Sequence, residues 1–209
     1  MRRLTLFSLA AFLMLGGCND EKTPNADNFT KAINRYLVKH GRACVSIGQT
    51  FPIDVPESEL KDQYGTAPQM AALEQAGLVR GNDTTAVIRG MMGALGPLAP
   101  RPVRHYELTD EGRKYLQIKP GVFGQNAGFC YGHETVDSIV KWTEPAAMGP
   151  YTRSEAPYTY KLVNLAAWAE QPDMQCAFPD IQTTIVGASK VDRIVRLQLT
   201  TKAGEIREQ

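Results

Sequence analysis

Alternating polar and apolar residues in the second half of the chain restrict the fold more than any other feature. The alternation runs through three stretches, Val136–Trp142, Tyr158–Leu162 and Val191–Leu199. Because successive side chains of a strand point to opposite faces of a sheet, a period of two predicts strands with one buried and one wetter face. Strands of this kind are typical of antiparallel sheets. We therefore expect the region 128–209 to form a β-rich subdomain.

The first half of the chain has a helical period instead. Apolar residues in the segment 27–40 recur three and four positions apart, as Phe29, Ile33, Tyr36 and Leu37. This spacing places them on one face of a helix. Asn25 is a suitable residue to cap the start of that helix, and Gly41 a suitable residue to end it.

Two further helices are predicted downstream. Thr66-Ala67-Pro68-Gln69 fits a capping box with proline in the first turn, and Gly77 ends the helix that follows. Thr109 caps a third helix over 110–116. The acidic residues Asp110 and Glu111 suit the positive end of that helix and are better explained in this way than as an acid/base pair.

These elements predict an α+β fold, with a helical half followed by a small antiparallel β-sheet. The Gly-containing stretch 120–128 is expected to connect a helical subdomain, 26–120, to the β-rich subdomain, 128–209. The other expected elements are strands at 43–47 and 104–108, a long Gly- and Pro-rich loop at 89–102, short crossing helices at 165–170 and 172–178, and a turn at 187–190 that leads from 181–186 into the last strand.

The N-terminus carries a basic pair, an uncharged run from Leu4 to Leu15 and the sequence Leu15-Gly16-Gly17-Cys18. The run is too short for a bilayer span of about 20 residues but has the length of a signal-peptide core. The four residues resemble the lipobox of bacterial lipoproteins. The resemblance implies a signal peptide over 1–17, cleavage between Gly17 and Cys18, and acylation of Cys18. An ordinary secretory signal is the alternative.

The resemblance also implies a cellular location for the mature chain. Residues 18–25 read as a lipidated tether, and the lipid on Cys18 makes the membrane a partner. Asn19 is not the aspartate associated with retention at the inner membrane, so the periplasmic face of the outer membrane is favoured. Cleavage removes two of the 23 basic residues and none of the 22 acidic ones, which leaves 192 residues with a formal net charge of −1. This charge balance does not favour a nucleic-acid partner.

Three cysteines follow Cys18 in the sequence. An oxidising compartment favours one disulfide and one leftover thiol. Cys44 and Cys130 both lie in strand-like apolar stretches, so a Cys44–Cys130 disulfide is the favoured pairing, with Cys176 free. The other pairings, and three reduced thiols, remain open.

A helix ending in Leu73-Glu74-Gln75-Ala76-Gly77-Leu78-Val79 and a later junction, Tyr106-Glu107-Leu108-Thr109-Asp110-Glu111-Gly112, resemble the winged-helix pattern. The resemblance covers about 27–116 and implies a winged-helix-like half, although the Gly- and Pro-rich wing is unusually long. A recognition helix needs basic residues for phosphate contacts. Residues 70–79 contain Glu74 and no lysine or arginine, so we expect no nucleic-acid binding.

No group of residues in the sequence predicts a catalytic or metal site. Cys130 and His133 lie three positions apart, but zinc needs three or four ligands and a thiol nucleophile needs an orienting partner. A structural cysteine beside a histidine is the simpler interpretation. The aromatic residues of the second half are expected to be core rather than a ligand-binding face: Trp142, Tyr158, Tyr160 and Trp168.

The stretches F-C-Y-G (129–132), V-x-x-I-V-x-W-T-E-P (136–145) and Y-T-Y-K (158–161) are similar to uncharacterised lipoproteins of Gram-negative bacteria. That family supplies no activity. The sequence therefore predicts a lipid-anchored periplasmic protein with a non-catalytic binding or envelope-associated role, a possible envelope protein as partner, and no cofactor or metal. The alternatives are an unrecognised enzyme that uses Cys130 and His133, or a small-ligand carrier on the aromatic sheet face.

Overall fold

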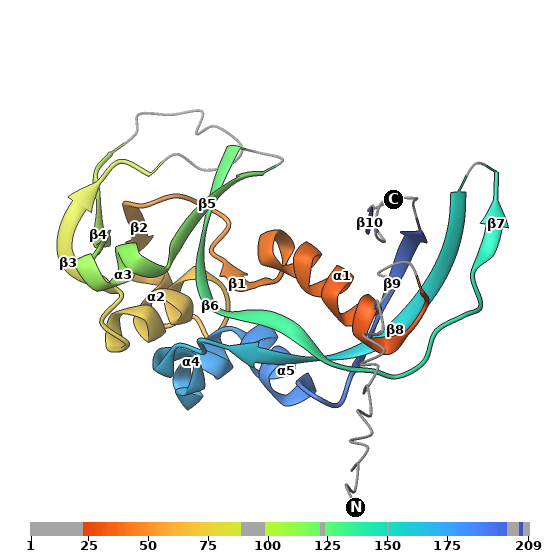
Figure 1. The fold of residues 1–209 in the computed structure, drawn as a ribbon. Helices are drawn as coiled ribbons and strands as arrows, with labels where there is room; N and C mark the ends of the chain where they lie inside the picture. The colour runs from red at the N-terminus through yellow and green to blue at the C-terminus, as the bar shows by residue number, and fades with distance from the viewer. Residues whose placement is uncertain (1–22, 89–98, 122–123, 150, 200–204, 207–209) are drawn as a thin grey trace, which may run out of the picture.

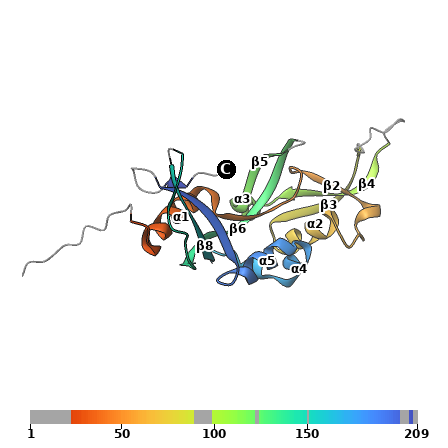
Figure 2. The ribbon, with the colours of Figure 1, turned by 90° about the vertical axis from the view of Figure 1, so that its right-hand side faces the viewer.

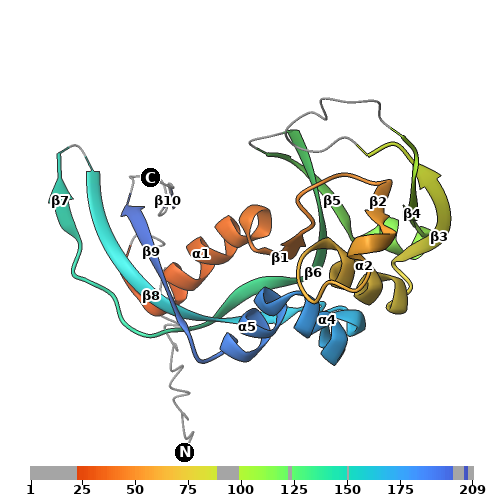
Figure 3. The ribbon, with the colours of Figure 1, turned by 180° about the vertical axis from the view of Figure 1, so that it is seen from behind.

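The computed structural model describes residues 23–88, 99–121, 124–149, 151–199 and 205–206. The chain has an α+β fold with two antiparallel sheets. The ribbon is curved, with the first helix on the inner side of the curve and two later helices on the other side of the long central strand (Figures 1 and 3). No helix in the described part of the chain is both long and apolar enough to cross a membrane.

The larger sheet has seven strands, so it is not the small sheet predicted from the sequence. Its strands are β1 (Arg42–Ser46), β5 (Leu116–Gly121), β6 (Gly124–Ile139), β7 (Ala146–Met148), β8 (Tyr151–Val163), β9 (Asp192–Leu199) and β10 (Glu205–Ile206). The main order is β1-β6-β8-β9-β10, while β5 pairs with β6 and β7 with β8. Strands β1 and β5 come from the half of the chain that was expected to be helical.

The predicted connector at 120–128 is wrong, because this stretch forms the two arms of a hairpin. Gly121 pairs with Gly124, and the pairing continues to Leu116 and Phe129. Gly128 is needed here because β1 lies close to β6: a Cβ atom at this position would lie 2.7 Å from the Val45 carbonyl oxygen. The glycines of this stretch thus allow tight strand pairing rather than marking a linker.

Helix α1 (Ala26–His40) forms as its apolar spacing predicts. The Asn25 side chain accepts a hydrogen bond from the Asn28 backbone N–H, and Gly41 follows the last turn. Its buried face joins strands of the larger sheet in one of two cores: Phe29, Ala32, Ile33, Leu37, Val136, Ala156, Tyr158, Tyr160 and Leu197. The Val136 N–H donates to the Asn34 side chain, so α1 also covers an edge of β6.

The smaller sheet contains β2 (Ile53–Pro56), β3 (Val79–Ala86) and β4 (Arg101–Leu108), in the order β2-β4-β3. The 3-10 turn η1 (Glu57–Glu59) and the helices α2 (Thr66–Gln75) and α3 (Asp110–Tyr115) accompany it. The predicted capping box at the start of α2 is wrong: Gly65 occupies the cap position, and Thr66 is already helical. Of the predicted loop 89–102, residues 89–98 lie outside the described part, and 101–102 belong to β4.

The two motifs that resemble a winged helix meet in space. Thr109 caps α3 as predicted: its Oγ1 accepts from the Gly112 N–H at 3.0 Å and donates to the Gly77 carbonyl at 2.7 Å. Gly112 is buried against the backbone of Leu78, which leaves no room for a side chain. The end of α2 is therefore held directly against the start of α3.

The helices of the second half lie between β8 and β9 in the sequence. They are η2 (Ala167–Glu170), α4 (Pro172–Ala177) and α5 (Pro179–Gly187), so residues 181–186 are helical. Figure 2 shows α4 and α5 on the side of β6 that is opposite to β5. Trp168, Met174 and Phe178 are buried in the larger core, where they join Met70 and Leu73 of α2.

Candidate functional site

The predicted lipidation residue, Cys18, and the predicted cleavage site after Gly17 lie outside the described residues. Lipidation therefore stays a prediction from the sequence. The other predicted site residues, Cys44, Cys130 and His133, all lie on β1 or β6.

Cys44 and Cys130 form a disulfide in the structure, with the two Sγ atoms 2.09 Å apart. They are direct partners in the pairing of β1 with β6. Cys176 lies on α4 with an exposed free thiol. The bond thus links strands that are 86 residues apart in the sequence.

A β-bulge brings His133 to the same face of the sheet as Cys130. Arg42 pairs with His133 and Cys44 with Cys130, so β6 carries one residue more than β1 between these pairs. In a regular strand, residues three positions apart would face opposite sides. Cys130 is nevertheless bonded to Cys44 and has no thiolate to act as a nucleophile with His133.

The aromatic residues singled out in the sequence are mainly core. Tyr158, Tyr160 and Trp168 are buried, and burial raises the pKa of both tyrosine phenols. Trp142 is partly exposed and contacts the edge of the Phe29 ring. These three buried rings therefore offer no open ligand-binding face.

Acidic side chains of α3 pair within their own helix. Lys114 donates to Glu111, and this hydrogen bond lowers the pKa of the carboxyl. Arg113 lies near Asp110. Within the residues that the structure places, no group of three or more His, Cys, Asp or Glu is arranged to hold a metal ion.

A hollow of about 240 Å³ lies beside the disulfide. Its lining includes Cys44 and Ser46 of β1, Gln117 and Lys119 of β5, and Asn126, Ala127 and Gly128 of β6. The Gln117 amide oxygen lies 3.2 Å from the Cys130 Sγ and 3.5 Å from the Cys44 Sγ. The wall of the hollow thus carries a hydroxyl, two amides and one ammonium group.

Basic residues lie along the exposed face of α1 and continue onto β1. Lys31, Arg35 and Lys39 are exposed and lie one turn apart, about 6 Å along the axis. Arg42 follows on the face of β1 that also carries Cys44 and Ser46. Among the described residues, none of these four basic side chains forms a salt bridge. We call Lys31, Arg35, Lys39, Arg42 and Lys119, with the hollow, the basic face.

Sequence reasoning missed the basic face, although part of its signal was readable. Lys31, Arg35 and Lys39 recur every four residues, as clearly as the apolar stripe of the same helix. The contribution of Lys119 was not readable, because it depends on the pairing of β5 with β6.

A second hollow of about 460 Å³ lies at the other end of the larger sheet. Both signs of charge line it, since Glu144 and Glu155 accompany Arg153 and Arg196. The Arg196 Nε donates to Glu155 at 2.9 Å. This hollow therefore has no excess charge of one sign in its lining.

Comparisons with known proteins give no relative for this chain. No protein-family model matches it, and no curated protein and no solved structure is significantly similar to it.

Proposed function

We propose that this protein is a lipoprotein, tethered through Cys18 to the periplasmic face of the outer membrane, with a non-catalytic binding role in the envelope. The observation that carries the proposal is the sequence Leu15-Gly16-Gly17-Cys18 at the end of an uncharged run. The run is too short to span a bilayer but suits a signal peptide. Diacylation of Cys18 would then bury enough methylene groups for stable anchoring.

The cysteine arrangement supports this compartment. A disulfide that joins two strands persists in an oxidising space such as the periplasm and is rare in the cytosol. Cys44 and Cys130 are placed for such a bond. The same bond removes the thiol that the alternative, an enzyme using Cys130 and His133, would need.

A winged-helix-like arrangement of residues 27–116 belongs to the same proposal. The strand order β2-β4-β3 and the contact between the ends of α2 and α3 support it. Glu74 of α2 is engaged by Arg104 at 2.8 Å, and its helix has no lysine or arginine. We propose that this half serves as a scaffold or protein-contact module.

Intact mass measurement of the protein from membranes of a Gram-negative host tests the proposal. The full-length precursor should be recovered as a mature chain that begins at Cys18 and carries the added mass of acyl chains. The Cys18→Ser variant should lose the acyl mass and the membrane fraction, whereas the Cys176→Ser variant should keep both. A wild-type protein that retains Met1 and carries no fatty acid would contradict the proposal.

A second experiment tests the location of the protein within the envelope. Separation of inner and outer membranes should place the wild-type chain in the outer-membrane fraction. Asn19→Asp should move it toward the inner membrane without changing acylation. Equal distributions of the two proteins would remove the outer-membrane part of the proposal and leave the anchor intact.

A further inference from the structure

We propose that the basic face is the binding surface of this protein and that its ligand is an anionic glycan strand. The inference rests on the proposed function, which places the chain in the envelope. Its structural basis is the juxtaposition of unpaired basic side chains on α1 and β1 with a polar hollow between β1, β5 and β6.

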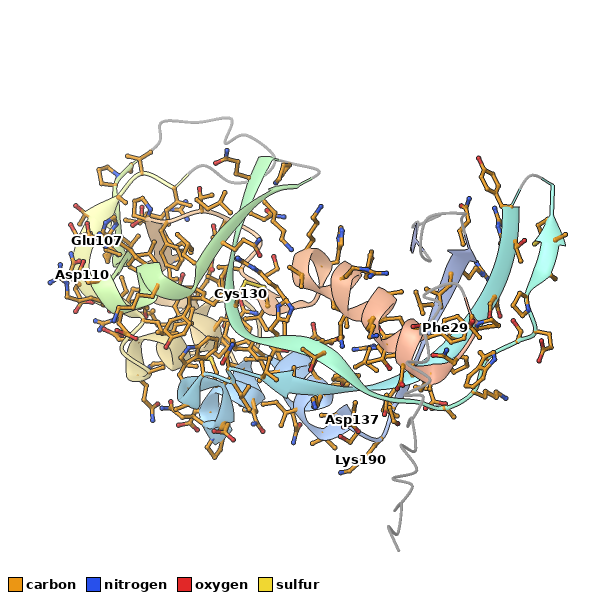
Figure 4. The ribbon with its side chains drawn as sticks, in the orientation of Figure 1. Phe29, Glu107, Asp110, Cys130, Asp137 and Lys190 are labelled. Carbon is orange, nitrogen blue, oxygen red and sulfur yellow. A yellow bond between two sulfur atoms is a disulfide. The ribbon has the colours of Figure 1, made fainter. Side chains whose placement is uncertain are left out.

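The two parts of the basic face are continuous. Helix α1 ends at His40, Gly41 follows, and Arg42 begins β1. The Glu134 N–H donates to the Gly41 carbonyl at 2.6 Å, which holds this junction against β6. Figure 4 shows Cys130 on β6 beside the end of α1. A ligand that lies along α1 therefore reaches the hollow without leaving the surface.

The charge of this surface differs from that of the whole protein. The mature chain has a formal net charge of −1, yet the basic face gathers Lys31, Arg35, Lys39, Arg42 and Lys119. On the exposed side of α1, the one acidic residue is Asp27 in the first turn. Among the side chains that the structure describes, these basic groups have no acidic partner, and such a cluster attracts a ligand that carries repeated negative charges.

The shape of the molecule favours a strand over a flat bilayer. α1 lies on the inner side of the curve, and β5–β6 and β8–β9 rise beside its two ends (Figures 1 and 3). A flat bilayer would meet those strands before it reached the middle of α1. A flexible chain is narrower than a bilayer, so it can enter between those strands and contact α1.

The hollow favours a carbohydrate as the polymer. Ser46 supplies a hydroxyl group, and Gln117 and Asn126 supply amides, all of which can both donate and accept hydrogen bonds. Gly128 also lines the hollow and adds no side-chain group of its own. Such neutral groups match the hydroxyl and amide groups of sugars, while the adjacent lysines and arginines match carboxylates.

Fluorescence anisotropy of a labelled oligogalacturonate with the mature, acylated protein in neutral detergent tests the inference. The triple variant Lys31→Gln/Arg35→Gln/Lys39→Gln should weaken binding at least about tenfold, because it removes three basic groups that attract the anionic ligand. It should also reduce the salt dependence of the affinity. The matched control Lys61→Gln/Lys141→Gln/Lys190→Gln removes the same charge from exposed sites elsewhere and should change binding less than about twofold.

Competitors identify the class of ligand. A neutral oligosaccharide of the same length should not compete, and polyglutamate of matched charge should compete at least about tenfold more weakly than oligogalacturonate. Polyglutamate that competes equally would replace the glycan with an acidic protein partner. Tighter binding to phosphatidylglycerol vesicles would replace it with the membrane, and equal affinity of both triple variants would remove the basic face from the site.

Two controls separate this inference from the proposed function. The melting temperature followed by circular dichroism should be the same for the wild type and for both triple variants. This would show that the substitutions leave the fold intact. Intact mass of the same preparation reports acylation independently of binding. Glycan binding without acylation would overturn the anchor but not the surface, and acylation without glycan binding would overturn the surface but not the anchor.

Discussion

At the scale of single residues, Gly112 has less room for a side chain than the other glycines of the described structure, because it lies against the backbone of Leu78. A Cβ atom at position 112 would overlap the Leu78 carbonyl oxygen, which is held in place by the Thr109 backbone N–H at 3.1 Å. Backbone cannot move aside as a flexible side chain can. Glycine at this position is therefore a requirement of the contact between α2 and α3.

Gly112→Ala should lower the free energy of unfolding by about 1–3 kcal/mol, because overpacking a well-packed contact typically costs this much. Urea denaturation followed by circular dichroism measures the loss. Gly132→Ala is the matched control, since its new methyl group would meet neighbours at ordinary distances of 3.6–3.8 Å. Equal stability of the two variants would show that α3 can shift away from Leu78.

Helix caps were predictable from the sequence where the side chain of the capping residue itself accepts the backbone hydrogen bond. Asn25 and Thr109 were predicted as caps, and each accepts the expected backbone hydrogen bond. Thr66 failed, because Gly65 precedes it with a φ of 86° and takes the cap position. The sequence pattern shows which residues can cap a helix, but the preceding turn decides which one does.

At the scale of elements, one carboxylate connects α2 to both strands of the β3–β4 hairpin. Glu74 accepts from the Gly81 backbone N–H at 3.0 Å and from the Arg104 Nη2 at 2.8 Å. The hydrogen bonds that Arg104 donates to Glu74 and Asp83 raise the pKa of Arg104, which stays charged at any ordinary pH. Both side chains are about 30% exposed, so solvent screens this pair in part.

Glu74→Gln should destabilise the protein by about 1 kcal/mol, because it keeps the size of the side chain but weakens a charged hydrogen-bond network. Chemical denaturation in low salt is the measurement, and the difference should shrink in high salt. Glu170→Gln removes a charge at an exposed site and should leave stability unchanged. A loss of the same size in the Glu170 variant would attribute the effect to net charge.

The disulfide connects elements that are distant in the sequence. Closing a loop across 86 residues restricts the unfolded chain, so the bond should contribute about 2–5 kcal/mol. The Cys44→Ser/Cys130→Ser variant should lose this amount of unfolding free energy, measured by thermal and urea unfolding. The wild-type protein under reducing agent should show the same loss. Cys176→Ser should match the wild type. Mass spectrometry of the native protein that finds free thiols at 44 and 130 would contradict the assignment.

At the scale of the whole molecule, the sequence predicted elements better than their assembly. The apolar stripe of α1 and the alternation in β8 and β9 depend on local spacing and were predicted. The strand predicted over 136–142 is wrong beyond Ile139, where β6 ends and Val140 and Trp142 are exposed. The pairing of β1 with β6 joins distant segments, and only the favoured Cys44–Cys130 disulfide indicated it. The hairpin of β5 and β6 was taken for a linker, since the same glycines that permit close strand pairing also occur in connectors.

The candidate site was likewise predicted only in part. The facing cysteines were predicted, whereas the bulge that turns His133 toward the face of Cys130 leaves no signal in the spacing. The hollow beside the disulfide is lined by residues of three strands, β1, β5 and β6. A surface built from three separate segments can be seen only once those segments are assembled.

Two cores share one long strand. Phe129 and Tyr131 of β6 belong to the larger core, Val136 of the same strand belongs to the smaller one, and Leu162 of β8 packs against both. Separating the cores would break the pairing of β6 and β8 at His133 and Val163. The structure therefore predicts that the two halves unfold together rather than as independent domains.

The two tryptophans of the chain test this directly, because each reports on a different core. Trp142 contacts Phe29 of the smaller core at a ring-centroid distance of 5.6 Å, and Trp168 lies inside the larger core. Trp168→Phe leaves Trp142 as the single fluorophore, and Trp142→Phe leaves Trp168. In each variant, the fluorescence and circular dichroism midpoints in urea should coincide, because a two-state transition gives the same midpoint for every probe. If the Trp142 signal changed at lower urea than the circular dichroism of the same variant, α1 and the smaller core would unfold separately, and β6 would not couple the two halves.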